Sequence, residues 1–466
     1  VDNKLIVSGG NTAAGTIYRL ATRYINLTPS TPISTWHEKN ENANYIARHE
    51  CGFVQAGNKF YLIGGRESST VEIYDYSSDT WTQLQPNPLE FSHFQAMEYE
   101  GLIWVIGALA DNNFPTDSPA DHVWIFDPTS QVWIQGPELP AGRQRGAAGL
   151  AMHNGKFYVV AGNTNGHDGG YVPWFDEYDP ATGTWTSLAD APNARDHFQV
   201  MVHNDKLYAI GGRLSGGPGG IFSPNVPEVD VYDFTTSSWS TLPEPANLPV
   251  ARAGASLAFF DDQILVIGGG VENQEVDGVL TTGVLNLTEA LDPNTLTWTR
   301  LANTVYNRRA SQAIVSGDGI HILGGSNVLA GGQIKDMEYY GTDNPQGSPI
   351  IKSQLTTSTT ELSWDTADPQ TLDLDVSNGN SGIFVRSMQI NGVNASDFAF
   401  VSGELNNSLL LADSQHTVNL QYTGLDASAT ADLLIDYGFD EQLSVSLNYN
   451  QLPLSIVSFT LIDTDN

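Results

Sequence analysis

Five arginines of the chain stand at one fixed distance from a recurring doublet of small residues. Each precedes the first residue of a Gly-Gly or Ala-Gly doublet by sixteen positions; they are Arg48, Arg145, Arg195, Arg252 and Arg308. Arg66 and Arg213 directly follow doublets. The strand that begins near each arginine and the strand that ends at the doublet are expected to run antiparallel, so the start of one and the end of the other share a face. We therefore expect all seven guanidinium groups at one opening, where they would bind the carboxylate or sulfate groups of an anionic ligand.

Three histidines lie near the same positions of the sequence. His49 follows Arg48, and His93 and His197 each stand fourteen residues before their doublets. Imidazoles from different repeats that meet near one axis could bind a metal ion or act as a general base. The alternative is that they only pack, and we expect no metal, no other cofactor and no catalytic residue. The three histidines are thus predicted to join the arginines as ligand contacts.

Seven segments repeat one apolar pattern that ends in the doublet. They are KLIVSGG (4–10), KFYLIGG (59–65), LIWVIGA (102–108), KFYVVAG (156–162), KLYAIGG (206–212), QILVIGG (263–269) and GIHILGG (319–325). In five units an Asp follows, six residues before a Trp, as in Asp75 and Trp81. The Asp is expected to cap a turn between two strands, and the Trp to fill the space between neighbouring sheets. Each unit is thus predicted to be a sheet of four antiparallel strands, and radial repetition of such sheets gives a β-propeller.

The spacing of doublet, aromatic residue and Trp closely resembles the kelch repeat. The resemblance covers residues 1–345 and implies an all-β, seven-bladed kelch-type β-propeller, since seven doublets are present. Kelch repeats often carry arginine at the position described above to bond adjacent blades, which is the structural alternative to ligand binding. The end units are irregular: the first has Trp36 without the preceding Asp, and the last has Tyr340 without a Trp. Ring closure is therefore incomplete in these repeats, and we expect either that residues have been lost upstream of Val1 or that a closing strand comes from near residues 346–356.

A second module is expected after the propeller. Residues 346–452 lack doublets and contain short alternating strands such as TVNLQY (417–422), which is typical of an Ig-like β-sandwich. The segments 385–400 and 429–449 resemble the Ig-like "choice-of-anchor D" modules of large secreted bacterial proteins. Residues 453–466 are predicted to begin a further module or to form the last strand of the sandwich.

Composition narrows the possible partners. The chain has 53 acidic and 20 basic residues and a formal net charge of −33, so nucleic acid and anionic lipid surfaces are poor partners. No run of about eighteen apolar residues is present, so no membrane span is expected. The single cysteine, Cys51, excludes an intrachain disulfide and is predicted to be a buried, inert thiol.

Long connections follow several doublets and are expected at the same opening as the arginines. They span residues 109–121, 163–174, 213–228 and 270–283. Long loops on a rigid scaffold commonly carry recognition. Their aromatic residues could stack on sugar rings or pack within the loops; these are Phe114, Tyr171, Trp174 and Phe222. Four aspartates could bind calcium, although no twelve-residue calcium-binding loop pattern is present; they are Asp111, Asp117, Asp121 and Asp168.

These features favour an extracellular or cell-surface binding or adhesion protein. Its ligand would be a glycan or another acidic molecule held at the arginine-rich opening, and other modules of a longer chain would be its neighbours. Two alternatives stay open. One is a lyase-type enzyme on acidic polysaccharide, with His or Tyr as the base and Arg neutralising the carboxylate. The other is a structural spacer or filament subunit with no small ligand.

Overall fold

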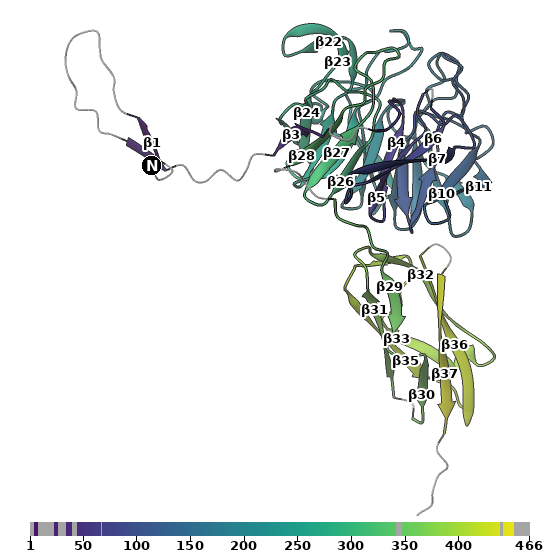
Figure 1. Ribbon diagram of the computed structural model, residues 1–466. Helices are drawn as coiled ribbons and strands as arrows, with labels where there is room; N and C mark the ends of the chain where they lie inside the picture. The colour runs from purple at the N-terminus through teal and green to yellow at the C-terminus, as the bar shows by residue number, and fades with distance from the viewer. Residues whose placement is uncertain are drawn as a thin grey trace, which may run out of the picture.

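The structure is a computed structural model that describes residues 4–7, 23–26, 34–39, 44–66, 68–341, 347–366, 368–438 and 441–451. These residues form β-strands and two short 3-10 turns, η1 (Glu244–Ala246) and η2 (Ala395–Asp397). A propeller is followed by a second, two-layered β domain (Figure 1). Within the described ranges, no helix has the length and apolar character needed to cross a membrane.

Six antiparallel sheets of four strands make the blades of the propeller. Blade 1 contains β4 (Gly52–Ala56), β5 (Lys59–Ile63), β6 (Thr70–Asp75) and β7 (Thr80–Pro86). Blade 2 contains β8 (Ala96–Tyr99), β9 (Leu102–Val105), β10 (His122–Asp127) and β11 (Val132–Glu138). Blade 3 contains β12 (Gly149–His153), β13 (Lys156–Val160), β14 (Phe175–Asp179) and β15 (Thr184–Ser187).

The remaining blades follow the same order, with one exception in the last. Blade 4 contains β16 (Gln199–His203), β17 (Lys206–Ile210), β18 (Asp230–Asp233) and β19 (Ser238–Thr241). Blade 5 contains β20 (Ser256–Phe260), β21 (Gln263–Ile267), β24 (Thr288–Asp292) and β25 (Thr297–Arg300), and a hairpin of β22 (Gly270–Val276) and β23 (Val279–Val284) projects from it. Blade 6 contains β26 (Ala313–Ser316), β27 (Gly319–Leu323), β28 (Met337–Gly341) and, as its outer strand, β3 (Thr35–Glu38).

The expectation of seven blades is wrong: the described residues close into a ring of six. The inner strands contact one another in the order β4, β8, β12, β16, β20 and β26, and β26 contacts β4. The first repeat does not build a blade, because β1 (Lys4–Val7) pairs with β2 (Arg23–Asn26) in a separate two-stranded sheet. The doublet of that repeat lies outside the described residues, and its Trp36 stands in β3, the outer strand of blade 6.

The closing strand also differs from the expectation. It is β3, from the N-terminal side of the propeller, rather than a strand from residues 346–356. Of that range, residues 347–353 precede the second domain and β29 (Gln354–Thr357) belongs to it. The physical reason is that β3 supplies the Trp that every other blade carries on its outer strand: Trp36 lies opposite Tyr340, as Trp81 lies opposite Tyr74 in blade 1.

The predicted turn and core roles are borne out by the contacts. The Asp75 carboxylate accepts hydrogen bonds from the backbone N–H groups of Ser77 and Ser78, and Asp233 caps its turn in the same way. An apolar cluster lies between each pair of neighbouring blades, and a Trp contributes to every one of the six. Burial between blades therefore holds the ring together.

Around the axis, six residues with left-handed backbone join the blades. Their φ values run from 49° to 65°, and each N–H donates to the carbonyl of its counterpart in the preceding blade; they are Glu50, His93, Ala147, His197, Gly254 and Ala310. The six bonds form a closed circle. In blades 2, 4 and 6 a glutamine stands two residues after the left-handed residue. Its side-chain amide bonds to backbone groups at the inner strands of other blades; the three are Gln95, Gln199 and Gln312.

The second domain has two sheets that face one another across one apolar core. One contains β29, β31 (Gln370–Ser377), β35 (Gln415–Tyr422) and β33 (Phe398–Ser402). The other contains β30 (Glu361–Trp364), β37 (Glu441–Asn450), β36 (Ser428–Tyr437), β32 (Ile383–Asn391) and β34 (Ser408–Leu410). The Ig-like assignment stays a prediction. The prediction for residues 453–466 concerns a segment outside the described residues.

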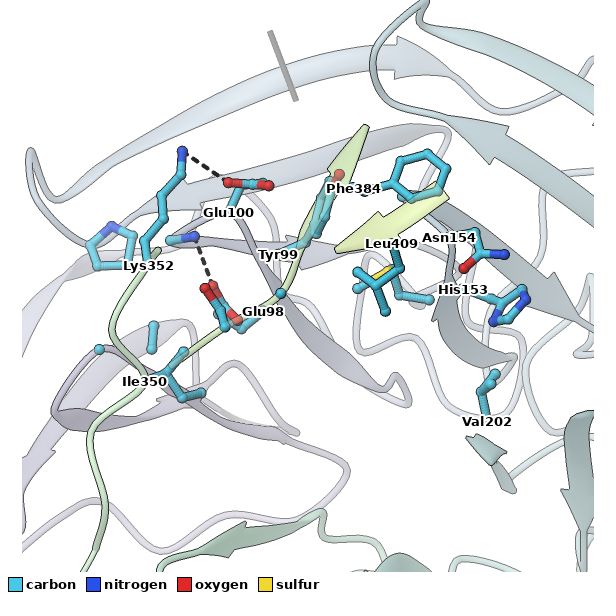
Figure 2. A pocket seen from close by; sticks show the side chains of 18 of the residues that line it. Glu98, Tyr99, Glu100, His153, Asn154, Val202, Ile350, Lys352, Phe384 and Leu409 are labelled. Carbon is cyan, nitrogen blue, oxygen red and sulfur yellow. Dashed lines mark hydrogen bonds and ion pairs between the residues drawn. The ribbon is translucent and has the colours of Figure 1, made fainter. Parts of the chain in front are cut away.

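The second domain packs against the face of the propeller opposite the doublets. A cavity of about 980 Å³ lies between them. Figure 2 shows Lys352 of the connecting segment facing Glu100 of the β8–β9 turn. The Lys352 ammonium group lies 2.9 Å from carboxylate oxygens of both Glu100 and Glu441. Phe384 lies on the same cavity, beside Gly155. The doublet face is therefore left clear of the second domain.

Candidate functional site

The five spaced arginines are internal bonds of their blades. Each guanidinium is at most 1% exposed, and each bonds to the carbonyl of its own doublet and to a carboxylate on the third strand of its blade. The pairs are Arg48–Glu72, Arg145–Asp176 (2.8 Å), Arg195–Asp230 (2.6 Å), Arg252–Glu289 (2.5 Å) and Arg308–Glu338 (2.7 Å). Arginine's planar fork suits such a multiple contact, which joins three segments of one blade.

In blade 2 two aromatic residues take the place of the arginine and its carboxylate partner. Phe91 stands at its arginine position and Trp124 at its carboxylate position, and their ring centroids are 5.9 Å apart. The sequence carried this signal: an acidic residue stands nine positions before each Trp in the arginine-containing blades 1, 3, 4 and 5, and Trp124 stands there in blade 2. The arginine and the acidic residue therefore occur together.

The expectation that these five arginines face the opening is corrected by their burial. A guanidinium that is buried and already paired with a carboxylate cannot contact a ligand outside the blade. Arg66 and Arg309 line a cavity at the propeller opening where the doublets end. Arg213 is only 3% exposed and lies beside that opening. We call this opening the mouth.

Each mouth arginine is already matched by a carboxylate. Arg66 bonds Asp117 at 2.7 Å, and Arg309 bonds Glu50 at 2.7 Å. Arg213 lies 3.8 Å from Asp196, and its Nε donates to the Ser215 hydroxyl at 2.9 Å. The mouth is thus a network of alternating charge rather than a purely cationic patch. These acidic partners, which fix the guanidinium groups in place, were not predicted from the sequence.

A cavity of about 300 Å³ occupies the mouth. It is lined by His49, Glu50, Arg66, Asn112, Phe114, His167, Phe222, Arg309 and residues 329–331. Phe114 lies over the Arg66 guanidinium at 5.7 Å, and Phe222 lies over that of Arg213 at 5.0 Å. The long loops therefore do bring aromatic rings to the mouth, as expected. Trp174 instead covers Arg143, at 4.9 Å, and Tyr171 pairs with Asn163 in its own loop.

Below this cavity, three histidines converge on the axis. His93 and His197 stand at left-handed positions of blades 2 and 4, and His167 enters from the 163–174 loop. The Nε2 atoms of His167 and His197 are 3.2 Å apart, and one ring nitrogen of each histidine lies within 4.8 Å of the others. The predicted third member, His49, faces the mouth cavity instead. His167 was missed because it lies outside the repeat position that aligns the other two.

The environment keeps these imidazoles uncharged. Burial, assisted by neighbouring cationic groups, lowers the pKa of His93 and His197 well below 6.5. Burial also lowers the pKa of His49 to about 4. For Glu50, burial raises the pKa but Arg309 and other neighbours lower it more, and the result is about 2. Neutral imidazole beside ionised carboxylate is a combination suited to accepting a proton or a cation.

The candidate cysteine and loop aspartates form no further ligand site among the described residues. Cys51 is buried, and burial raises its pKa to about 12, which fits the predicted inert thiol. Asp111 accepts backbone hydrogen bonds within its loop, and Asp121 bonds His122. Among the described residues, the three axial histidines are the one group close enough to hold a metal ion. The four aspartates considered for calcium form no such group among the described residues.

Comparison with known proteins gives three kinds of similarity. The sequence profile of the KLHDC2/KLHL20/DRC7 Kelch-repeats domain family matches residues 1–212 and 136–325. The chain is 28% identical to Kelch-like protein terF of Aspergillus terreus over 294 residues, which are 60% of this chain and 61% of that protein. It is 30% identical to Alpha-scruin of Limulus polyphemus over 148 residues, 30% of this chain and 16% of that protein.

One solved structure supports the fold alone. The structure of YjhT superposes with a TM-score of 0.53 at 16% identity, and the match covers 63% of this chain and 94% of that one. The curated relatives are longer than their matched parts, since the chain spans 61% of the first and 16% of the second. The profile match ends at residue 325, so the resemblance of the second domain to choice-of-anchor D modules stays a prediction.

Proposed function

Because the chain belongs to the KLHDC2/KLHL20/DRC7 Kelch-repeats domain family, we propose that its propeller is a binding module and that the mouth is its ligand site. The observation that carries the proposal is the 300 Å³ cavity at the propeller axis, where cationic and aromatic side chains meet. Concave sites with a few placed polar groups are the usual form of a ligand site. The second domain covers the opposite face and leaves this one open.

The ligand we propose is acidic and also presents a flat or apolar surface. Arg66 and Arg309 line the cavity and can donate to a carboxylate or sulfate group. Their own carboxylate partners hold them in place and balance their charge, so charge attraction alone is modest. Phe114, which is 53% exposed, adds a ring on which a sugar or a planar side chain can stack.

The rim favours a macromolecular partner. The 109–121, 163–174 and 213–228 loops border the mouth, and the β22–β23 hairpin projects from blade 5 (Figure 1). At the tip of this hairpin Val279 is 64% exposed and Leu280 is 73% exposed. Exposed apolar tips beside a concave site are typical of interaction surfaces. An acidic polysaccharide or an acidic protein segment fits this description, and a glycan ligand and an extracellular location remain our predictions.

The test is a binding screen of the whole chain on arrays of acidic oligosaccharides and acidic peptides. We expect a subset of acidic ligands to bind, with an affinity that falls as salt is raised. Arg66→Gln should weaken binding, whereas Lys206→Gln should not, because Lys206 is an exposed residue at the start of β17, at the end of that strand opposite its doublet. If no acidic ligand binds, or if both variants bind as the wild type does, the mouth is not the site. Unsaturated product from a uronate polymer would instead identify a lyase.

A further inference from the structure

We propose that the propeller axis carries a binding site for one divalent transition-metal ion, held by His93, His167 and His197. We define these three residues as the axial histidine cluster. The site is separate from the proposed ligand contacts of the mouth and does not require that an acidic ligand bind there. Three histidines with an open fourth position are a common donor set for zinc and related ions.

The spacing of the ring nitrogens matches a single ion. The Nε2 atoms of His167 and His197 lie 3.2 Å apart. Two nitrogens bound at about 2.0 to 2.1 Å to a tetrahedral ion are separated by about 3.3 to 3.4 Å. The ring of His93 completes the triangle, with its centroid 5.0 Å from that of His167 and 4.8 Å from that of His197. The three rings come from different parts of the chain, so the fold builds the cluster.

The opposite nitrogen of each ring is held by another side chain. Nδ1 of His197 lies 2.5 Å from an oxygen of Asp196, and Nδ1 of His167 lies 3.2 Å from an oxygen of Asp117. Both aspartates have no exposed surface. Nδ1 of His93 lies 2.9 Å from the Ser92 hydroxyl. Metal-binding histidines commonly donate their second N–H to a carboxylate or a hydroxyl, which fixes the tautomer and turns the Nε2 lone pair to the ion.

When Nδ1 of a histidine carries the proton, its Nε2 lone pair needs a donor or a cation as a partner. With Nδ1–H donated to Asp117 and Asp196, the Nε2 atoms of His167 and His197 are both acceptors, and they face each other. His93 Nε2 is buried and has no hydrogen-bond partner among the described residues; its closest carboxylate oxygen, on Glu50, is 3.4 Å away. Unpartnered buried polar atoms are costly, so their convergence needs a cause. A metal ion satisfies all three at once.

The surroundings suit an ion of double positive charge. The mouth arginines and their acidic partners balance one another, as Arg66 with Asp117 and Arg309 with Glu50. Glu50 borders both the mouth cavity and the narrow cavity below it, and its carboxylate lies 3.4 Å from His93 Nε2. An ion here has an approach from solvent through the mouth.

Metal titration of the intact chain tests the site. After chelator treatment and its removal, the chain should bind one Zn²⁺ per molecule by calorimetry, and Co²⁺ should give the intense visible absorption of a tetrahedral nitrogen site. His167→Gln should abolish stoichiometric binding. Asp196→Asn should weaken it by about 10- to 100-fold, the usual effect of losing a residue that orients a ligand. His321→Gln is the matched control, because His321 is a buried histidine of blade 6 outside the cluster, and it should bind as the wild type does.

Two results would overturn the proposal. One is a wild-type chain that is folded after chelator treatment, by its thermal unfolding transition, and takes up no Zn²⁺ or Co²⁺ at micromolar concentration. The other is uptake that is the same in His167→Gln, His93→Gln and the wild type, since the ion would then lie elsewhere. His167 is on a loop, and the unfolding transition of each variant shows whether a loss of binding is local.

Discussion

Trp36 lies opposite Tyr340 across the pairing of β3 with β28, so residues more than three hundred positions apart complete one blade. A Trp lies opposite an aromatic residue in blades 1 to 4 as well, as Trp81 opposite Tyr74 and Trp239 opposite Tyr232, whereas in blade 5 Trp298 lies opposite Leu291. The Trp36 ring is 5% exposed, and its indole N–H donates to the Thr288 hydroxyl of blade 5 at 3.1 Å. Trp36 is therefore the side chain that anchors the closing strand in the core between blades 5 and 6.

Loss of this side chain should open the ring. We expect Trp36→Ala to lower the free energy of unfolding by about 3–5 kcal/mol, the usual range for a buried aromatic residue. Trp185→Ala is the matched control: Trp185 has the same position in blade 3 but is only half-buried and does not close the ring. Urea unfolding measures both. A loss for Trp36→Ala no larger than that for Trp185→Ala would contradict the assigned closure.

The buried arginine pairs should affect stability and not binding. Arg252→Met leaves the Glu289 carboxylate buried without its main partner, which costs about 3–5 kcal/mol. The double variant Arg252→Met, Glu289→Met removes both charges and should recover much of that loss, as the Phe91–Trp124 contact of blade 2 suggests. Chemical unfolding gives the two values. Ligand affinity of either folded variant should equal that of the wild type, and a selective loss of affinity would restore the arginines to the site.

The exposed ring at the mouth should have the opposite effect. Phe114 is 53% exposed, so Phe114→Ala should change the unfolding free energy by less than about 0.5 kcal/mol, as is usual for surface positions. Its loss should reduce affinity for the acidic ligand several-fold, because the stacking surface is removed. Val132→Ala, on the outer strand of blade 2 and also 53% exposed, is the control that keeps full affinity. Equal affinities of the two variants would exclude Phe114 as a contact.

Stability should fall on mild acidification because of one buried histidine away from the axis. Burial, with a smaller effect of Lys39, lowers the pKa of His321 from 6.5 to about 4. The unfolded chain therefore takes up this proton first, and the contribution of His321 is complete above about pH 6.5 and is lost as the pH falls towards 4. His321→Gln should reduce the slope of unfolding free energy against pH in this window, where the full effect is up to about 3 kcal/mol. An unchanged slope would contradict the assignment.

Repetition made most of the fold predictable. The doublets, the Asp of each turn and the Trp six residues later identified a kelch-type propeller, because these residues recur at fixed spacing. The blade number was overestimated, since the first doublet segment has the right pattern but pairs in a separate sheet. In the sequence, the missing Trp of the last unit and the isolated Trp36 of the first are separate irregularities, and the closing strand is expected near 346–356, whereas the pairing of β28 with β3 shows that the two irregularities have one cause.

The site was less predictable, because it depends on which side chains are paired. A spacing rule found the arginines, but only the acidic residue nine positions before the Trp distinguishes a buried pair from a free cation. The axial histidine cluster combines two residues of one repeat position with His167, which enters from a loop of no fixed pattern. Contacts between loop side chains form only when the whole ring has folded, so the local sequence around each residue does not predict them.

The central claim, that the mouth is the ligand site, is tested most directly by one comparison. Titration calorimetry measures the affinity of the wild-type chain and of the Arg66→Gln and Lys206→Gln variants for the acidic ligand selected on the arrays. We predict a loss of about tenfold, or about 1.4 kcal/mol, for Arg66→Gln and no change for Lys206→Gln. Equal affinity of all three proteins, with every one folded, would contradict the claim and place the ligand elsewhere on the chain.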